Sequence, residues 1–226
     1  EQLYEKYEKK MPHLEKIKAR ELMSKIIEAQ IETGQPYMLY KDSINNKSNQ
    51  KNIGIIKSSN LCAEIVEYSD NKETSVCNLA SIALPQFIKK TNNKKEYDYK
   101  KLYETAKLAT KNLDQVIDIN YYPTEKTGTS NNKHRPIGLG IQGLADVYFK
   151  LNIAYDSNKA KEINKRIFET IYFGALESSC ELAKEKGAYS TFKGSPLSEG
   201  KFQFDLWDAK PSQMWDWDTL KEKIKK

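Results

Sequence analysis

The stretch GIIKSSNLCAEIVEY, residues 54–68, places three polar side chains of different chemistry between two short apolar runs. Asn60, Cys62 and Glu64 alternate along it. If the backbone is extended there, the three side chains project to the same side, because successive strand residues point to opposite faces. An amide, a thiol and a carboxylate would then converge on one small volume.

The chemistry of this triplet favours a thiol that acts neutral or as a radical. A neighbouring carboxylate raises the pKa of a thiol and so disfavours the thiolate form. A cysteine-protease nucleophile needs the opposite, a cationic neighbour that stabilises the thiolate, so Cys62 does not fit that role. Glu64 would then serve as a general base, and Asn60 would orient a hydroxyl group. The same alternation also fits an inert packed cysteine. Cys77 could pair with Cys62, pair with a cysteine outside the chain, or stay unpaired.

Composition narrows the class of protein. The 226 residues suffice for one large domain or two small ones, and no stretch approaches the roughly 20 apolar residues of a membrane helix. Residues 1–7 show no secretory signal. Two histidines and three scattered cysteines predict neither a zinc site nor a disulfide framework, which indicates a reducing compartment. The net charge of +6 is spread over lysine-rich segments, so we expect a solvated surface and no nucleic-acid face.

Apolar periodicity predicts an α/β protein, in which helices alternate with short strands. Three long helices are expected, over residues 13–33, 98–117 and 157–186. Gly34 and Gly187 are typical helix ends, and Ser157 is a typical N-cap. Cys180 lies near the apolar face of the third helix, where it is expected to pack as a small core residue.

The segments between and after these helices are predicted to form one strand, two loops and a short helix. Residues 36–40 are expected to form a short buried strand, and residues 42–52 and 124–132 to form loops. A short helix is expected to start near Asp216. The apolar residues of the C-terminal tail suggest that this tail packs onto the main body.

Gly138, Gly140 and Gly143 spell the G-x-G-x-x-G pattern of dinucleotide-binding loops. That interpretation requires a buried strand just before the glycines, and residues 133–136 contain no run of β-branched residues. We therefore expect these glycines to let a helix pack closely against neighbouring backbone.

Several longer blocks occur in a fixed order along nearly the whole chain. They are ETGQPYMLYKD (32–42), KSNQ (47–50), SSNLCAEIVEY (58–68), VCNLAS (76–81), residues 134–146, GSP (194–196) and FDLW (204–207). In this order and with these gaps, the chain resembles the large subunit of class I ribonucleotide reductase of the eukaryotic and related viral type.

The resemblance implies a fold and a domain organisation. The chain would form part of a ten-stranded α/β barrel built from two antiparallel halves, with long flanking helices and the radical cysteine on a finger loop inside. Residues 1–226 would be a single fragment of that catalytic barrel domain. The N-terminal cone domain, the effector loops and the C-terminal tail would lie outside the chain.

The resemblance also implies a reaction, the reduction of ribonucleoside diphosphates to 2′-deoxyribonucleoside diphosphates. Cys62 matches the transient thiyl radical that takes the 3′ hydrogen, and Glu64 matches the base for the 3′-hydroxyl proton. Asn60 matches the amide that binds the ribose hydroxyls, and Leu61 would join Asn60 and Glu64 in contacting substrate. Cys77 matches one half of the reducing dithiol. Burial of such a site would keep the radical from water.

Cofactors and partners follow from the same resemblance. The chain itself would bind no metal or cofactor. A small subunit with a di-iron/tyrosyl centre would supply the radical, thioredoxin or glutaredoxin would supply electrons, and ATP and deoxynucleotide effectors would bind elsewhere. The full large subunit would be a cytoplasmic homodimer that binds neither nucleic acid nor a membrane.

The chain departs from the family pattern in what it lacks. The family's partner cysteine for Cys77 lies upstream, its relay tyrosines lie beyond Lys226, and its phosphate-binding loop is absent, so the chain alone is expected to be inactive. Two other readings remain: a cobalamin-dependent (class II) reductase, and an inactive reductase-like module that binds partner chains. The surrounding blocks favour class I over the first. The joint presence of the four site residues counts against the second.

Overall fold

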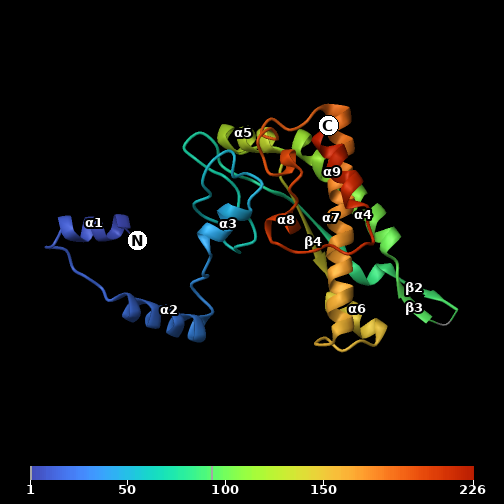
Figure 1. Ribbon diagram of the computed structural model, residues 1–226, viewed down its shortest axis with the longest axis horizontal. Helices are drawn as coiled ribbons and strands as arrows, with labels where there is room; N and C mark the ends of the chain where they lie inside the picture. Colours follow the sequence, from blue (N-terminus) through green and yellow to red (C-terminus); the bar gives the residue numbers. More distant parts are fainter. Residues whose placement is uncertain (1, 93) are drawn as a thin grey trace. The chain divides into compact units, whose positions relative to one another are not determined.

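The computed structural model describes residues 2–92 and 94–226, and the chain divides into two compact units, Glu1–Tyr40 and Lys41–Lys226 (Figure 1). The first unit contains α1 (Gln2–Lys10) and α2 (Ala19–Thr33). Helix α2 starts later than predicted, but its end is confirmed. Gly34 adopts a left-handed conformation with φ +75°, and its amide donates to the carbonyl of Gln30.

The predicted strand over residues 36–40 is wrong. These residues form exposed irregular backbone directly after the end of α2. A strand becomes stable only when a neighbouring strand takes its hydrogen bonds and covers one face. An apolar run of this length carries no information on whether such a neighbour exists.

The second unit begins with a helix where a loop was predicted, α3 (Lys41–Lys47). The helix is short and polar, so it shows no apolar period. Its Asn45 side chain bonds the backbone of Ile56 twice, accepting from the amide at 2.7 Å and donating to the carbonyl at 3.0 Å. These contacts tie α3 to the buried residue that precedes the 58–68 block.

Two long helices, α4 (Tyr99–Ile119) and α7 (Asn158–Lys186), lie side by side in this unit (Figure 1). Both predicted helices are confirmed, and Asp98 and Ser157 cap them by accepting a hydrogen bond from the amide three residues on. The helices approach closely at Gly174, where an added Cβ atom would lie 2.9 Å from the carbonyl oxygen of Tyr103. A larger residue at this position would separate the two helices.

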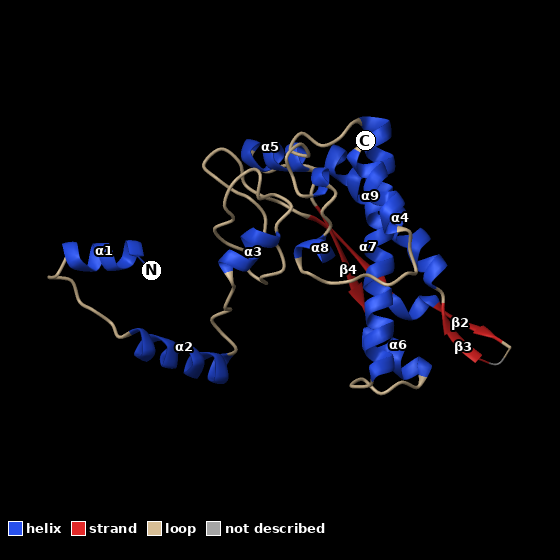
Figure 2. Cartoon of the chain, in the orientation of Figure 1, coloured by secondary structure: helices blue, strands red, loops and turns tan. Residues whose placement is uncertain are grey.

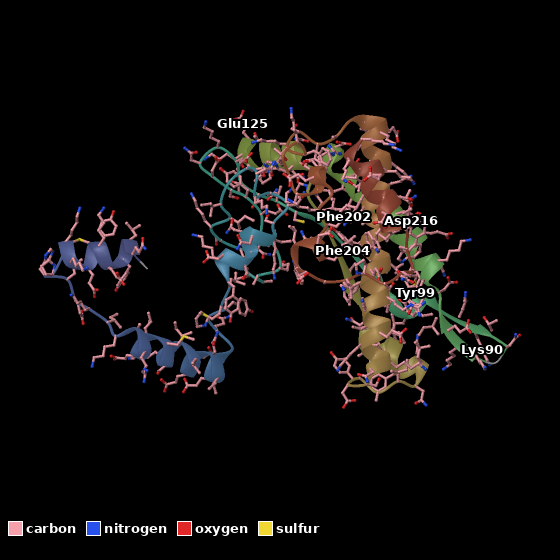
Figure 3. The ribbon with its side chains drawn as sticks, viewed as in Figure 1. Lys90, Tyr99, Glu125, Phe202, Phe204 and Asp216 are labelled. Atoms are coloured by element: carbon pink, nitrogen blue, oxygen red, sulfur yellow. The ribbon has the colours of Figure 1, made fainter. Side chains whose placement is uncertain are left out.

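The strands of the described residues form two separate two-stranded sheets, shown in red in Figure 2. β1 (Asn78–Ala83) pairs in parallel with β4 (Ile137–Gln142) in the register Asn78↔Ile137 to Ala83↔Gln142. β2 (Ile88–Thr91) and β3 (Lys94–Tyr97) form an antiparallel hairpin, which carries Lys90 (Figure 3). The α/β class is confirmed, and the described residues contain a strand pair and a hairpin but no closed barrel.

The G-x-G-x-x-G segment is a strand followed by a helix start, so the expectation that these glycines serve helix packing is wrong for the first two. Gly138 and Gly140 lie within β4. Gly143 adopts φ +76° just before α6 (Leu144–Leu151), a conformation that glycine reaches without strain.

A second predicted loop, residues 124–132, is also a helix, α5 (Glu125–His134). Thr124 caps it by accepting from the amide of Thr127, and the Thr127 hydroxyl interacts in return with the Thr124 backbone. The sequence shows no apolar period here, and this reciprocal cap stabilises the start of the helix instead. The side chains of Ser130, Asn131 and His134 are buried, so α5 uses polar contacts to join the core.

Two hydrophobic clusters hold the second unit together. The first lies where β1, α4, α6 and α7 meet, and it includes Ile82, Leu102, Val147 and Ile167. The second is aromatic and joins α7 to the C-terminal tail through Phe173, Phe202, Trp217 and Leu220. Phe202 and Phe204, which is in α8 (Gln203–Leu206), are labelled in Figure 3, and the ring of Phe204 packs edge-on against Trp217.

The tail and the third cysteine follow the sequence-based prediction. A short helix, α9 (Trp217–Lys225), starts after Asp216, whose side chain accepts from the amide of Thr219. Cys180 is partly buried against the aromatic cluster, as expected for a core residue. None of the described helices combines the length and apolar character needed to cross a membrane.

Candidate functional site

The Asn60–Glu64 motif forms a tight turn, so the predicted extended backbone is wrong. The amide of Ala63 donates to the carbonyl of Asn60 at 3.2 Å, and Ala63 has φ +66°. The Asn60 side chain accepts from the amide of Ile65 at 3.1 Å. Asparagine favours turns because its short side chain can take the place of a backbone hydrogen-bonding group. This local bonding outweighs the alternation of residue types.

The turn still brings the amide and the carboxylate of the motif together. Asn60 Nδ2 donates to Glu64 Oε1 at 2.6 Å, a short charge-assisted bond. The hydroxyl of Ser59 donates to the carbonyl of Ile65 at 2.6 Å and closes the base of the loop. Cys62 lies between the two bonded residues, on the exposed tip.

The motif is exposed within this chain, whereas burial was expected. Asn60, Cys62 and Glu64 are all exposed, and the side chain of Leu61 is 90% exposed. Hydrogen bonds within the loop fix its conformation, but the described residues do not cover its tip. The thiol and the carboxylate of the tip are free to meet a ligand.

Cys77 stands directly before β1 and is half-buried. Its sulfur packs over β4, since a Cβ atom added to Gly138 would lie 3.2 Å from Sγ. Cys62, Cys77 and Cys180 are all free thiols. Burial raises the pKa of the Cys77 thiol to about 12, and the neighbouring charges of Glu67 and Glu64 act in the same direction. Cys77 is therefore firmly protonated near neutral pH.

Sequence reasoning missed Glu67, whose charge influences the Cys77 thiol. The half-buried Glu67 carboxylate acts on the Cys77 thiol through its charge, and the Cys77 thiol donates to the carbonyl of Asn78 at 3.9 Å. Burial raises the pKa of Glu67 to about 7. Glu67 lies outside the alternation of residues 60, 62 and 64, so no pattern in the sequence indicates that it lies near the site.

A buried polar cluster fixes the loop that leads to Cys77. Glu73 is only 3% exposed, and its carboxylate oxygens lie 3.1 Å from His134 Nε2 and 3.0 Å from Lys133 Nζ. His134 Nδ1 lies 2.9 Å from the hydroxyl of Thr191. A fully bonded polar cluster rigidifies its surroundings, because each unpaired group would carry a desolvation cost. The cluster thereby joins the loop that contains Glu73 to α5 and to the segment after α7.

The first strand residue is anchored in the same way. The Asn78 side chain donates to Asn131 Oδ1 at 3.1 Å and to the carbonyl of Pro136 at 3.2 Å. Asn131 in turn donates to the hydroxyl of Tyr122 at 2.5 Å. These bonds connect β1 to α5 and to the start of β4. They set the position of Cys77, which immediately precedes Asn78.

Replacing Gly138 with alanine is expected to lower the free energy of unfolding by about 1 kcal/mol relative to Gly140→Ala. The new Cβ would overlap the exposed Leu79 side chain, which can swing aside, and would press on the sulfur of Cys77. At Gly140 the nearest atom to an added Cβ is the carbonyl oxygen of Ala80, at 3.7 Å, an ordinary contact. Urea unfolding of both variants measures the difference. Equal stabilities would contradict the close packing of Cys77 on β4.

The paired parallel strands and the helices against them define an α/β protein whose loops present thiols and carboxylates. All 226 residues match the family described as the ribonucleotide reductase barrel domain, and the chain belongs to that family.

Three curated relatives illustrate the similarity. The chain is 55% identical to ribonucleoside-diphosphate reductase large chain 2 of Saccharomyces cerevisiae, and 56% and 52% identical to the ribonucleoside-diphosphate reductase large subunits of Plasmodium falciparum and Variola virus. Each alignment covers 100% of this chain but only 26%, 28% and 29% of the respective relative. The chain therefore spans little more than a quarter of the length of these relatives.

Proposed function

We propose that this chain is the part of a ribonucleoside-diphosphate reductase large subunit that carries the radical cysteine and one reducing thiol. The observation that carries the proposal is the 2.6 Å bond between Asn60 and Glu64, with Cys62 on the turn between them. A thiol, a base and an orienting amide on one loop are what radical chemistry at a ribose requires. The family membership and the names of the relatives support the same conclusion.

Each residue has a role in the proposed reaction. Cys62, as a thiyl radical, takes the 3′ hydrogen of the ribose, and Glu64 accepts the 3′-hydroxyl proton so that the 2′-hydroxyl leaves as water. Asn60 orients the ribose hydroxyls and, through its bond to Glu64, the base itself. Leu61 contacts the substrate from the tip of the loop. Cys77 and a second cysteine supply two electrons and become a disulfide.

The proposed role of Cys77 agrees with its surroundings. A thiol that stays protonated carries the hydrogen that the reduction consumes, and the raised pKa of Cys77 keeps it in that form. The partner cysteine belongs to the remainder of the large subunit in this proposal. So do the phosphate-binding loop, the radical-relay tyrosines, and the cone domain and loops that bind ATP and deoxynucleotides. Residues 1–226 are then one fragment of the barrel domain.

The remaining partners follow from the proposed reaction. A small subunit with a di-iron/tyrosyl centre generates the radical, and thioredoxin or glutaredoxin restores the dithiol. The complete large subunit forms a cytoplasmic homodimer. The exposed tip of the loop is covered in that protein by other parts of the barrel, which keep water from the radical.

A reductase assay tests the function. The full-length large subunit, mixed with its small subunit, a ribonucleoside diphosphate and dithiothreitol, is expected to produce deoxynucleotide continuously, while the 226-residue chain is expected to produce none. Sustained production by the 226-residue chain would overturn the view that it is an incomplete enzyme. Nucleotide binding without turnover by the full-length protein would favour a binding module. Turnover that needs adenosylcobalamin in place of the small subunit would favour a class II enzyme.

A further inference from the structure

The segment over residues 66–77 connects the turn that carries the candidate radical thiol to the reducing thiol, Cys77. Its middle part closes into a ring over residues 69–75. The hydroxyl of Ser69 accepts from the amide of Ser75 at 2.9 Å and donates to the hydroxyl of Ser75, also at 2.9 Å. The two ends of the ring are therefore bonded to each other, and a displacement of the ring is transmitted to Cys77, which follows closely after it.

Helix α5 holds the far side of this ring (Figure 1). The carboxylate of Glu73 lies 3.0 Å from Lys133 Nζ and 3.1 Å from His134 Nε2. The amide of Thr74 donates to the carbonyl of Lys126 at 3.1 Å. Contacts from two successive residues thus attach the ring to a single helix.

The same helix also holds the residue after the thiol. Asn131 of α5 accepts from the side chain of Asn78 at 3.1 Å. Cys77 stands between Glu73 and Asn78 in the chain and directly precedes Asn78. The chain around the sulfur is therefore attached to α5 on both sides, and Cys77 keeps its place only while both attachments hold.

We propose that Glu73 and His134 are positioning residues, which hold Cys77 where it reacts with the partner cysteine. The inference rests on the proposed function, because it concerns the dithiol of that reaction. There, one ribonucleoside diphosphate and two thiols give one deoxyribonucleoside diphosphate, one disulfide and one water. Closing a disulfide brings the two Cα atoms to about 4.4–6.8 Å, so a displaced thiol reacts slowly. A shift of about 1 Å can lower a rate about 100-fold.

The burial and the bonding of the two side chains support this role. Glu73 is 3% exposed and His134 is 6% exposed. A carboxylate only accepts hydrogen bonds, so His134 Nε2 carries the proton of this contact, and Nδ1 is left to bond the hydroxyl of Thr191 at 2.9 Å. Losing the Glu73 carboxylate would leave a buried nitrogen without a partner and would release the ring.

The first test measures the equilibrium between the dithiol of Cys77 and its disulfide in the full-length large subunit. The protein is equilibrated in mixtures of reduced and oxidised dithiothreitol, and mass spectrometry gives the oxidised fraction. Glu73→Ala is expected to lower the equilibrium constant for closing the disulfide about tenfold, because the released thiol spends less time near its partner. The reduction potential of the disulfide then rises by about 30 mV.

Turnover supported by thioredoxin gives a kinetic readout of the same variant. Glu73→Ala is expected to lower kcat about tenfold, because every cycle consumes the dithiol. KM for the ribonucleoside diphosphate should stay within about twofold, because the bond between Asn60 and Glu64 lies within its own turn. A variant with a raised KM and an unchanged kcat and potential overturns the proposal.

Two further variants separate the reach of the side chain from its charge. Glu73→Gln keeps the length and can still bond Lys133 and His134, so the potential and kcat are expected to stay near the wild-type values. Glu73→Asp keeps the charge but is one methylene shorter, so the equilibrium constant should fall about threefold. Glu73→Asp is also the decisive variant if Glu73→Ala does not fold.

Ile171→Val is the control for a general loss of stability. Ile171 lies on α7 in the first hydrophobic cluster, which contains no residue of the ring. Removing a methylene there weakens the packing of the core, but the potential and kcat should match the wild type. An equal shift of the potential in Ile171→Val, or an unchanged potential in both Glu73→Ala and Glu73→Asp, overturns the proposal.

A third readout does not depend on the reaction. Hydrogen–deuterium exchange of the full-length protein is expected to become faster at residues 66–77 in Glu73→Asp, whereas α4 keeps its wild-type rate. Unchanged exchange at residues 66–77 overturns the positioning role of Glu73. If the wild-type protein makes no deoxynucleotides while the exchange changes as expected, the proposed function fails and the attachment of Cys77 to α5 stands.

Discussion

Replacing Cys62 with serine in the full-length large subunit is expected to abolish deoxynucleotide formation. Serine matches cysteine closely in size, and Cys62 is exposed on its turn within residues 1–226, so the substitution should leave the fold of this part intact. The hydroxyl hydrogen is bound more strongly than a thiol hydrogen, so serine cannot form the radical that takes the ribose hydrogen. An increase of about 5.5 kcal/mol in the barrier lowers a rate about 10⁴-fold, which is enough to remove detectable turnover.

The measurement is deoxynucleotide produced over time with the small subunit and a ribonucleoside diphosphate. Cys180→Ser is the matched control, because Cys180 lies on α7 against the aromatic cluster and has no proposed role in the reaction. We expect this control to keep its activity. Normal turnover by Cys62→Ser would remove Cys62 from the proposed mechanism.

Replacing Cys77 with serine is expected to stop the cycle supported by thioredoxin. A serine cannot form the disulfide that delivers two electrons, so each subunit loses its route to repeated reduction. The change is nearly isosteric and the site is only half-buried, so the free energy of unfolding should change by less than about 1.5 kcal/mol. The loss of activity would then reflect chemistry and not unfolding.

This second variant is assayed as product per subunit with thioredoxin, its reductase and NADPH. Urea unfolding of Cys77→Ser checks that the fold persists, and the same Cys180→Ser control accounts for a general effect of thiol removal. Thioredoxin-supported cycling at the wild-type rate would show that Cys77 is not one of the reducing thiols.

Local sequence was sufficient where an element carries its own period and cap. The helices α4 and α7 repeat apolar residues at helical spacing, and Asp98 and Ser157 bond the first turn from within the same few residues. Gly34 and Gly187 end α2 and α7 as predicted. Such features depend on neighbours in the chain, so they are visible before the fold is known.

Prediction failed where an element depends on distant partners. Helices α3 and α5 are polar, and they are held through Asn45, which bonds the backbone of Ile56, and through His134, which meets Glu73. Residues 137–142 contain two glycines and still form a strand, because β1 lies beside them and takes their hydrogen bonds. Contacts of this kind produce no periodic pattern of residue types, so the sequence alone does not reveal them.

The candidate site shows the same division. Residue types and block order by themselves determined the family, the identity of Asn60, Cys62, Glu64 and Cys77 as candidates, and the long helices. Only the tertiary structure decided that the motif is a turn, that Asn60 bonds Glu64, and that Cys77 packs on β4 at Gly138. The physical reason is that hydrogen bonding and burial act between segments that folding brings together. The sequence specifies the chemical type of each side chain, whereas the pKa of that side chain and its hydrogen-bond partners depend on the groups that surround it in the fold.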